Sequence, residues 1–166
     1  MPLRAGGEFA LVKEIVETAL GKSGQPVNTG TMAHDHDVYM ALADAAMETR
    51  DEAALRTYAP LLMELAERDG HELYLAIAQR AEAVARRLAG DYAGAEARLH
   101  LALEKFERLG TRWQEGRTLF ELGETAVETG NGEAARAYWG RALEAFEAIQ
   151  ARPNAKRTRE ALAALG

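Results

Sequence analysis

The chain has 166 residues, no cysteine and a formal net charge of −6 at pH 7. A chain of this length can bury an ordinary hydrophobic core without disulfide bonds or metals, and the lack of cysteine excludes thiolate nucleophiles and cysteine-ligated zinc. The acidic balance argues against nucleic acid as the main partner, because phosphate binding depends on clustered cations. No apolar run approaches the ~20 residues that cross a bilayer. The first residues lack the layout of a secretion signal, so we expect a cytoplasmic protein that binds no membrane.

Strong helix formers and only 4 prolines predict an all-α fold. In chain order, the first expected element is an amphipathic helix over residues 8–20, with Phe9, Val12 and Leu20 on one side. Residues 21–33 are rich in Gly, Ser, Pro, Asn and Thr, which predicts a flexible linker. Residues 1–33 are therefore interpreted as an N-terminal helix and a linker.

A repeat begins after this segment. Gly90 and Asp91 recur 40 residues later as Gly130 and Asn131, and Arg50 with Asp51 forms a weaker earlier copy. Two apolar stripes follow these turns in the same register, namely Ala95, Leu99, Ala102, Phe106, Leu109 and Ala135, Trp139, Ala142, Phe146, Ile149. Such spacing places each set on one face of a helix.

The pattern predicts three helix pairs within residues 34–150. The pairs cover residues 36–49 with 51–68, 72–89 with 92–109, and 112–129 with 132–150. Gly90 and Gly130 stand where a left-handed residue ends a helix at low cost, and Asp91 and Asn131 can cap the next helix. Pro60 falls inside an expected helix, so we expect a kink or break near Ala59. Residues 151–166 are interpreted as a C-terminal capping helix.

These residues resemble the tetratricopeptide repeat (TPR) family. The third pair carries Leu119, Leu122, Gly123, Ala126, Gly130, Ala135, Trp139, Ala142 and Leu143 at the family's apolar and small positions, and the second pair carries Ala83, Gly90, Ala95, Leu99, Ala102 and Leu103. The resemblance implies a right-handed α-solenoid of three antiparallel helix pairs, with a flanking helix at each end. The repeat is longer than the family's usual 34 residues and resembles the TPR regions of bacterial signal-transduction regulators, which implies a regulatory role.

The resemblance also implies a concave groove that binds a partner. Its implied lining residues are Met40, Asp44, Met47, Ile77, Arg80, Val84, Arg87, Arg117, Phe120 and Glu124. Arg80, Arg87 and Arg117 would form the hot spot and would favour an acidic partner. In the alternative interpretation these arginines pair with Glu124, Glu128 and Asp44 across the groove as exposed ion pairs.

A metal site is the strongest competing chemistry. Residues 34–37 read His-Asp-His-Asp, a set that can ligate a divalent ion. Consecutive residues at a helix start fan out around the axis, which favours the alternative that Asp35 or Asp37 caps the helix. His71 and His100 are interpreted as isolated surface or interhelix residues.

The leading hypothesis is a non-enzymatic interaction module for a protein or peptide, with no catalytic site, metal or cofactor. The alternatives are a sensor that binds a short peptide or small molecule in the groove and, less favoured, a metal-dependent enzyme that uses His34 and His36. Association of the chain with itself is left open.

Overall fold

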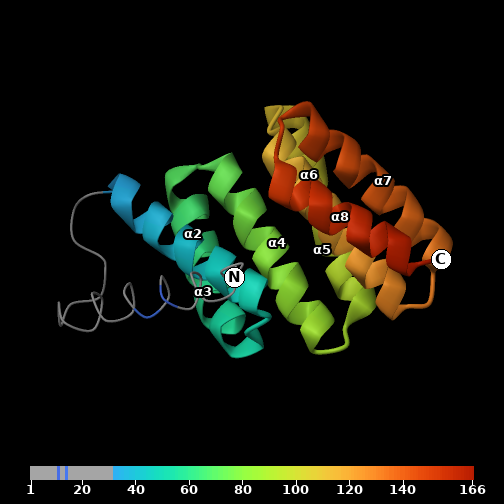
Figure 1. The fold of residues 1–166 in the computed structure, drawn as a ribbon. Helices are drawn as coiled ribbons and strands as arrows, with labels where there is room; N and C mark the ends of the chain where they lie inside the picture. The colour runs from blue at the N-terminus through green and yellow to red at the C-terminus, as the bar shows by residue number, and fades with distance from the viewer. Residues whose placement is uncertain (1–10, 12–13, 15–31) are drawn as a thin grey trace.

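A computed structural model describes residues 32–166 together with Leu11 and Glu14 (Figure 1). The helix expected over residues 8–20 and nearly all of the linker lie outside the described residues. The described part is all-helical and contains no strand, which confirms the expected fold class. Its helices are α2 (Met32–Thr49), α3 (Glu52–Asp69), α4 (Glu72–Leu88), α5 (Tyr92–Leu109), α6 (Arg112–Glu128), α7 (Gly132–Ala148) and α8 (Arg152–Ala164).

The start of helix α2 differs from the sequence expectation, whereas that of α8 agrees with it. Helix α2 begins at Met32, inside the expected linker, with Asp35 in its first turn, where a negative charge favours the helix dipole. Helix α8 begins at Arg152 and includes Pro153 in its first turn. Proline is well accepted there because its missing N–H would have no helical partner.

The turns repeat every 20 residues. Left-handed backbone occurs at each of them, at Arg50, Gly70, Gly90, Gly110, Gly130 and Gln150, with φ between 56° and 85°. The residue after each one donates its N–H back into the preceding helix, as Asp91 does to the Arg86 carbonyl at 2.9 Å and Asn131 to the Ala126 carbonyl at 2.8 Å. These bonds satisfy carbonyls that a helix end leaves unpaired.

The N-terminal caps alternate, which shows that the repeating unit is two helices. The side chains of Asp51, Asp91 and Asn131 accept backbone N–H groups at 3.0, 2.9 and 3.0 Å, at the starts of α3, α5 and α7. The residues that precede α4, α6 and α8 make no side-chain cap bond. The 40-residue period read from Gly90 and Gly130 is therefore confirmed.

Each helix packs on the next one along the chain, and α2, α4 and α6 also contact one another (Figure 1). We call α2, α4, α6 and α8 the inner helices, since α8 reaches α2 through Arg157 and Glu48. The other three, α3, α5 and α7, are called the outer helices.

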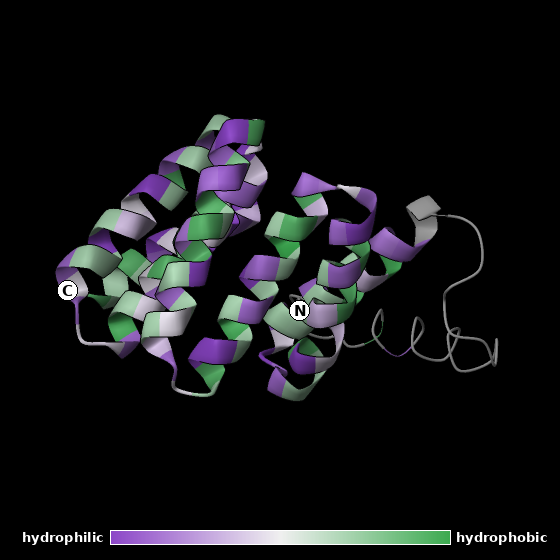
Figure 2. Ribbon diagram, turned by 180° about the vertical axis from the view of Figure 1, so that it is seen from behind, coloured by the Kyte–Doolittle hydropathy of each residue, from purple (hydrophilic) through white to green (hydrophobic). Residues whose placement is uncertain are grey.

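The apolar stripes of the outer helices are part of the core. Ala95, Leu99, Ala102 and Phe106 are buried, as are their counterparts 40 residues later. Hydrophobic and hydrophilic stretches alternate along the helices, as the green and purple segments of Figure 2 show. Leu109 and Ile149 were expected to continue the stripes, but both are exposed. They follow the last core turn of their helices, where the chain leaves the packed interior.

Pro60 does not interrupt its helix, so of the kink or break expected near Ala59 the break is wrong. Helix α3 is continuous from Glu52 to Asp69. Leu55 and Ala59 before the proline and Leu62 and Ala66 after it are all buried, while Pro60 itself is exposed. Packing on both sides of Pro60 therefore holds the helix together despite the lost hydrogen bond.

Helix α8 has the register of the first helix of a pair. It begins 40 residues after α6, and Thr158 repeats the role of Thr118. Both threonines are buried, and each hydroxyl donates to a carbonyl one turn earlier at 2.8 Å. Lys156 and Glu160 give the opposite side of α8 a polar surface.

Candidate functional site

The residues expected to line an open groove lie together, but they are largely enclosed. Six are buried, namely Met47, Ile77, Arg80, Val84, Arg87 and Phe120. The other four, Met40, Asp44, Arg117 and Glu124, are half-buried. The expectation of an open groove is thus corrected, because the inner helices are close enough for their own side chains to fill the space between them.

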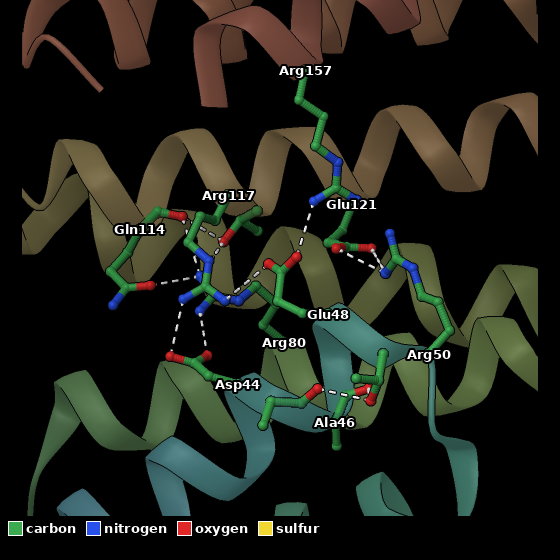
Figure 3. Close-up of polar contacts among 12 residues, drawn as sticks. Asp44, Ala46, Glu48, Arg50, Arg80, Gln114, Arg117, Glu121 and Arg157 are labelled. Atoms are coloured by element: carbon green, nitrogen blue, oxygen red, sulfur yellow. Dashed lines mark hydrogen bonds and ion pairs between the residues drawn. The ribbon is translucent and has the colours of Figure 1, made fainter. Parts of the chain in front are cut away.

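Arg80 on α4 is the most deeply buried of the expected hot-spot residues, at 1% exposure. Its guanidinium donates to Oε1 of Gln114 at 2.7 Å, lies 3.6 Å from the carboxylate of Asp44 and faces the ring of Phe106 (Figure 3). Burial, and beyond it the charge of Arg117, lowers the pKa of Arg80 to about 9. The side chain is therefore still cationic at neutral pH, and its charge is used inside the fold.

Glu121 on α6 binds two arginines from different parts of the chain. Arg87 of α4 donates to it at 2.6 Å. Arg50, in the turn after α2, donates to both carboxylate oxygens at 2.9 and 3.0 Å (Figure 3). Burial by itself would raise the pKa of Glu121, but Arg50 and Arg87 outweigh it and lower the pKa below its usual value. Glu121 is therefore an ionised, buried carboxylate.

Helix α2 supplies two further carboxylates to the same region. Asp44 accepts from Arg117 of α6 at 3.1 Å, and Glu48 accepts from Arg157 of α8 at 3.1 Å (Figure 3). Arg117 also lies 3.7 Å from Glu48, and the guanidinium of Arg157 faces the ring of Phe120 at 4.5 Å. One helix is thus connected to two others by ion pairs.

We call this set the inner ionic cluster. It comprises Asp44, Glu48, Arg50, Arg80, Arg87, Arg117, Glu121, Glu124 and Arg157. Its five guanidinium groups face four carboxylates, so nearly all of the arginine charge is matched within the protein. An acidic partner was expected because of the positive charge of these arginines. Most of that charge is neutralised within the cluster.

The alternative interpretation, in which the arginines pair across the groove, is confirmed for two of its three acidic residues. Arg80 lies near Asp44, and Arg87 lies 3.6 Å from Glu124. Glu128 instead accepts from Tyr92. The expected exposure of these pairs is wrong, because Arg80 and Arg87 are buried.

The groove residues expected from the sequence do not include Glu48, Arg50, Glu121 or Arg157. Arg50 had a usable signal, since it occupies the repeated turn position of Gly90 and Gly130 and needs a reason to replace glycine there. The 40-residue register also relates Arg157 to Arg117. The sequence gives no comparable signal for Glu121.

The space left inside the cluster is small. A cavity of about 10 Å³ is lined by Glu48, Arg117, Phe120, Glu121 and Arg157 together with Phe146 and Asn154. Such a volume accommodates about one water molecule. A small molecule would fit there only if the surrounding side chains moved.

Of the four residues considered for a metal site near the start of α2, the side chains of Asp35, His36 and Asp37 are among those that the structure describes, and that of His34 is not. No group of three metal-ligating side chains occurs in the described part of the chain. His36 is buried, lies 3.3 Å from Asp69 and contacts the rings of His71 and Tyr74. Asp37 accepts from the Tyr74 hydroxyl at 2.6 Å, which raises the pKa of Tyr74 to about 12.

Two other expectations for this region are corrected. Neither Asp35 nor Asp37 is the N-cap, because α2 has already begun at Met32. His71 is not isolated, since its ring meets that of His36 with 4.8 Å between centroids. His100 contacts Tyr138 on the neighbouring outer helix.

The described chain is thus an all-helical protein built on a 40-residue, two-helix repeat, and none of its described helices is long and apolar enough to cross a membrane. No family model and no curated protein sequence matches the chain. Among solved structures, its fold is similar to that of BtubC (BKLC) from P. vanneervenii, with a TM-score of 0.61. The two share 15% sequence identity over 96% of this chain and 73% of BtubC, a likeness that shows the fold alone.

Proposed function

We propose that the chain is a non-enzymatic, TPR-type interaction module that binds a segment of another protein. In this proposal it forms a right-handed solenoid of three antiparallel helix pairs with flanking helices, and it acts in the cytoplasm in a regulatory role. The alternating caps and the contacts among α2, α4 and α6 support this architecture.

One observation carries the proposal: ion pairs connect the inner helices at their shared face. Residues as far apart in sequence as Glu48 and Arg157 meet there. Ion pairs near a protein surface contribute about 0–1 kcal/mol each. The side chains of Arg157 and Glu48 are 44% and 25% exposed, so a partner can replace this pair at little net cost. Solenoids commonly use the face formed by such helices for binding.

A sensor for a small molecule in the inner groove is the weaker candidate. The cavity inside the ionic cluster has room for about one water molecule, whereas pockets for drug-sized ligands measure roughly 300–1,000 Å³. A protein segment requires no enclosed cavity, because it can bind along the rim at half-buried residues such as Met40 and Glu124.

The test compares two double variants in affinity capture from native cell extract. Met40→Ala with Glu124→Ala changes the rim of the inner face without removing a buried arginine. Leu61→Ala with Glu64→Ala is the matched control, because both residues are exposed on the outer helix α3. Circular dichroism and thermal unfolding establish that both variants fold.

We expect proteins recovered with the native chain to be lost with the inner variant and kept with the control. Once a partner is identified, its Kd for the inner variant should rise at least tenfold. Equal binding by the two folded variants would contradict a binding role for the inner face. Loss with the outer variant alone would assign binding to the outer helices.

A further inference from the structure

The position of Arg157 in the inner ionic cluster has the features of a binding site for a guanidinium group. Glu48 of α2 pairs with the Arg157 guanidinium at 3.1 Å (Figure 3). The Phe120 ring of α6 faces the same guanidinium at 4.5 Å. We call Glu48 and Phe120 the arginine seat. Its two walls come from α2 and α6, so the seat does not depend on α8 for its own residues.

The seat suits arginine better than lysine. A guanidinium is planar, so it can stack on an aromatic ring while its edge donates to a carboxylate. An ammonium group is compact and strongly hydrated and cannot make both contacts in the same way. The arrangement recurs in the cluster, where the Arg80 guanidinium lies near Asp44 and over Phe106.

Arg157 is the member of the cluster most readily exchanged. Its side chain is 44% exposed, compared with 27% for Arg50, 13% for Arg117, 3% for Arg87 and 1% for Arg80. It also lies on α8, the shortest of the described helices, in which Ala155 and Thr158 are the buried residues. Few buried contacts therefore hold this arginine in place.

The charges of the cluster also favour the replacement of Arg157 by an arginine from outside the chain. Without Arg157, the remaining four arginines of the cluster face four carboxylates, so its departure leaves a formally neutral cluster. Arg117 still lies 3.7 Å from Glu48 after such a change. An incoming arginine would restore the charge state that the protein now has, whereas an acidic side chain at the seat would meet Glu48.

We propose that the arginine seat binds an arginine side chain of a partner protein and that Arg157 of α8 occupies it when the partner is absent. This inference rests on the proposed function, because it specifies the chemistry of the partner at the inner face. It replaces the acidic partner expected from the sequence with one that presents arginine.

The seat can be tested without any partner by chemical rescue of the full chain. In Arg157→Ala the seat is empty, and N-ethylguanidinium is the probe. The indole N–H of Trp139 donates to the Phe120 carbonyl at 3.1 Å, so its resonance in ¹⁵N-labelled protein reports on the seat. Arg152→Ala is the matched control, since Arg152 is an exposed arginine of the same helix.

We expect a saturable shift of the Trp139 signal in Arg157→Ala, with a Kd at least tenfold lower for ethylguanidinium than for ethylammonium. Native protein and Arg152→Ala should bind the probe at least tenfold more weakly, and adding Glu48→Gln to Arg157→Ala should abolish saturation. If Arg157→Ala does not fold, Arg157→Lys takes its place, and ethylguanidinium should then bind it more tightly than it binds native protein.

A second probe extends the test from a small cation to a peptide. A capped pentapeptide with one central arginine among alanines should compete with ethylguanidinium in the variant, whereas its lysine counterpart should not. No saturable shift in a folded variant, or equal shifts in variant and native chain, would overturn the seat. Those outcomes would leave the proposed function standing, because the capture experiment depends on Met40 and Glu124.

Discussion

Glu121 receives charge-assisted hydrogen bonds from Arg50 and Arg87, and it is buried together with Arg87. Taking such charges out of water is costly, and only their mutual attraction and good hydrogen-bond geometry compensate for it. Removing one member is therefore worse than never having the pair, because the other charge stays buried without its partner. The destabilisation expected for Glu121→Ala therefore comes mainly from leaving Arg87 buried without its carboxylate.

Glu121→Ala should destabilise the protein by about 3–5 kcal/mol, the range found when one member of a buried ion pair is removed. The control is Glu104→Ala, which removes an exposed carboxylate from α5 and should change stability by no more than about 0.5 kcal/mol. Urea unfolding at pH 7, followed by circular dichroism, measures both. Equal stability of the two variants would mean that Glu121 is not needed to neutralise Arg50 and Arg87.

The contribution of Glu121 should depend on pH in a defined direction. Its pKa is lowered in the folded protein from the usual value of 4.5. As pH falls, Glu121 is therefore protonated at a higher pH in the unfolded chain than in the folded protein. Its stabilisation is fully present above pH 4.5 and is lost as pH falls through the folded pKa. The difference in unfolding free energy between native protein and Glu121→Gln should thus be constant from pH 7 to about pH 5 and shrink below that. A difference that grows as pH falls would mean that the pKa of Glu121 is raised, not lowered, in the folded protein.

Gly123 and Trp139 illustrate how small and large side chains compensate in the repeat. A methyl group at Gly123 would collide with the Trp139 indole, whose N–H donates to the Phe120 carbonyl. The equivalent residues 40 positions earlier are Ala83 and Leu99, both buried. The preceding repeat therefore has a larger residue on the inner helix and a smaller residue on the outer helix.

Gly123→Ala should cost about 1–3 kcal/mol through overpacking. Adding Trp139→Leu should recover part of that loss, because the double variant copies the Ala83 and Leu99 combination. Gly140→Ala is the control, since nothing lies near its added methyl group and alanine favours a helix interior by ~0.5–1 kcal/mol. Thermal unfolding of the native chain, the single variants Gly123→Ala and Trp139→Leu, the double variant and the control measures these effects. A double variant that is less stable by the sum of the two single losses would contradict the compensation.

Among the elements, the turns give a direct comparison of backbone strain with side-chain contacts. Arg50 and Gln150 are the described non-glycine residues with positive φ, at 56° and 57°, in places where other turns of the repeat have glycine. The left-handed region costs a residue with a side chain roughly 1–2 kcal/mol. Arg50 has a compensating role because its side chain pairs with Glu121.

Gln150→Gly should therefore stabilise the protein by up to about 1 kcal/mol, since it relieves strain but makes the unfolded chain more flexible. Arg50→Gly should destabilise it, because the same relief comes with the loss of the Glu121 pair. Unfolding free energies in urea decide the signs. If both substitutions shift stability in the same direction, Arg50 is not retained at its turn for the ion pair.

Much of the element arrangement could be predicted from the sequence because its signals are local. The stripe of Leu99 and Phe106 and the glycines of the turns at Gly90 and Gly130 lie within one or two helical turns of the groups they affect. The inner ionic cluster was not predictable in the same way. The register places Arg80 and Arg87 on one helix face, but their burial depends on residues 34 or more positions away, such as Gln114 and Glu121.

For the whole molecule, the pair between Glu48 and Arg157 joins helices that are 109 residues apart in sequence. Repeats in a solenoid usually contact their neighbours alone, so their stabilities are nearly a sum of local terms. Here α2, α4, α6 and α8 share one set of charges. The inner face therefore brings all four inner helices into contact, and any segment bound there would affect several of them together.

Hydrogen–deuterium exchange of the full chain, measured with and without a partner obtained by affinity capture, tests most directly whether binding takes place at the inner face. We expect the partner to slow exchange in α2 and α6 and to leave the outer helices α3 and α5 unchanged. Slower exchange confined to the outer helices, with α2 and α6 unaffected, would contradict the assignment of the inner face as the binding surface.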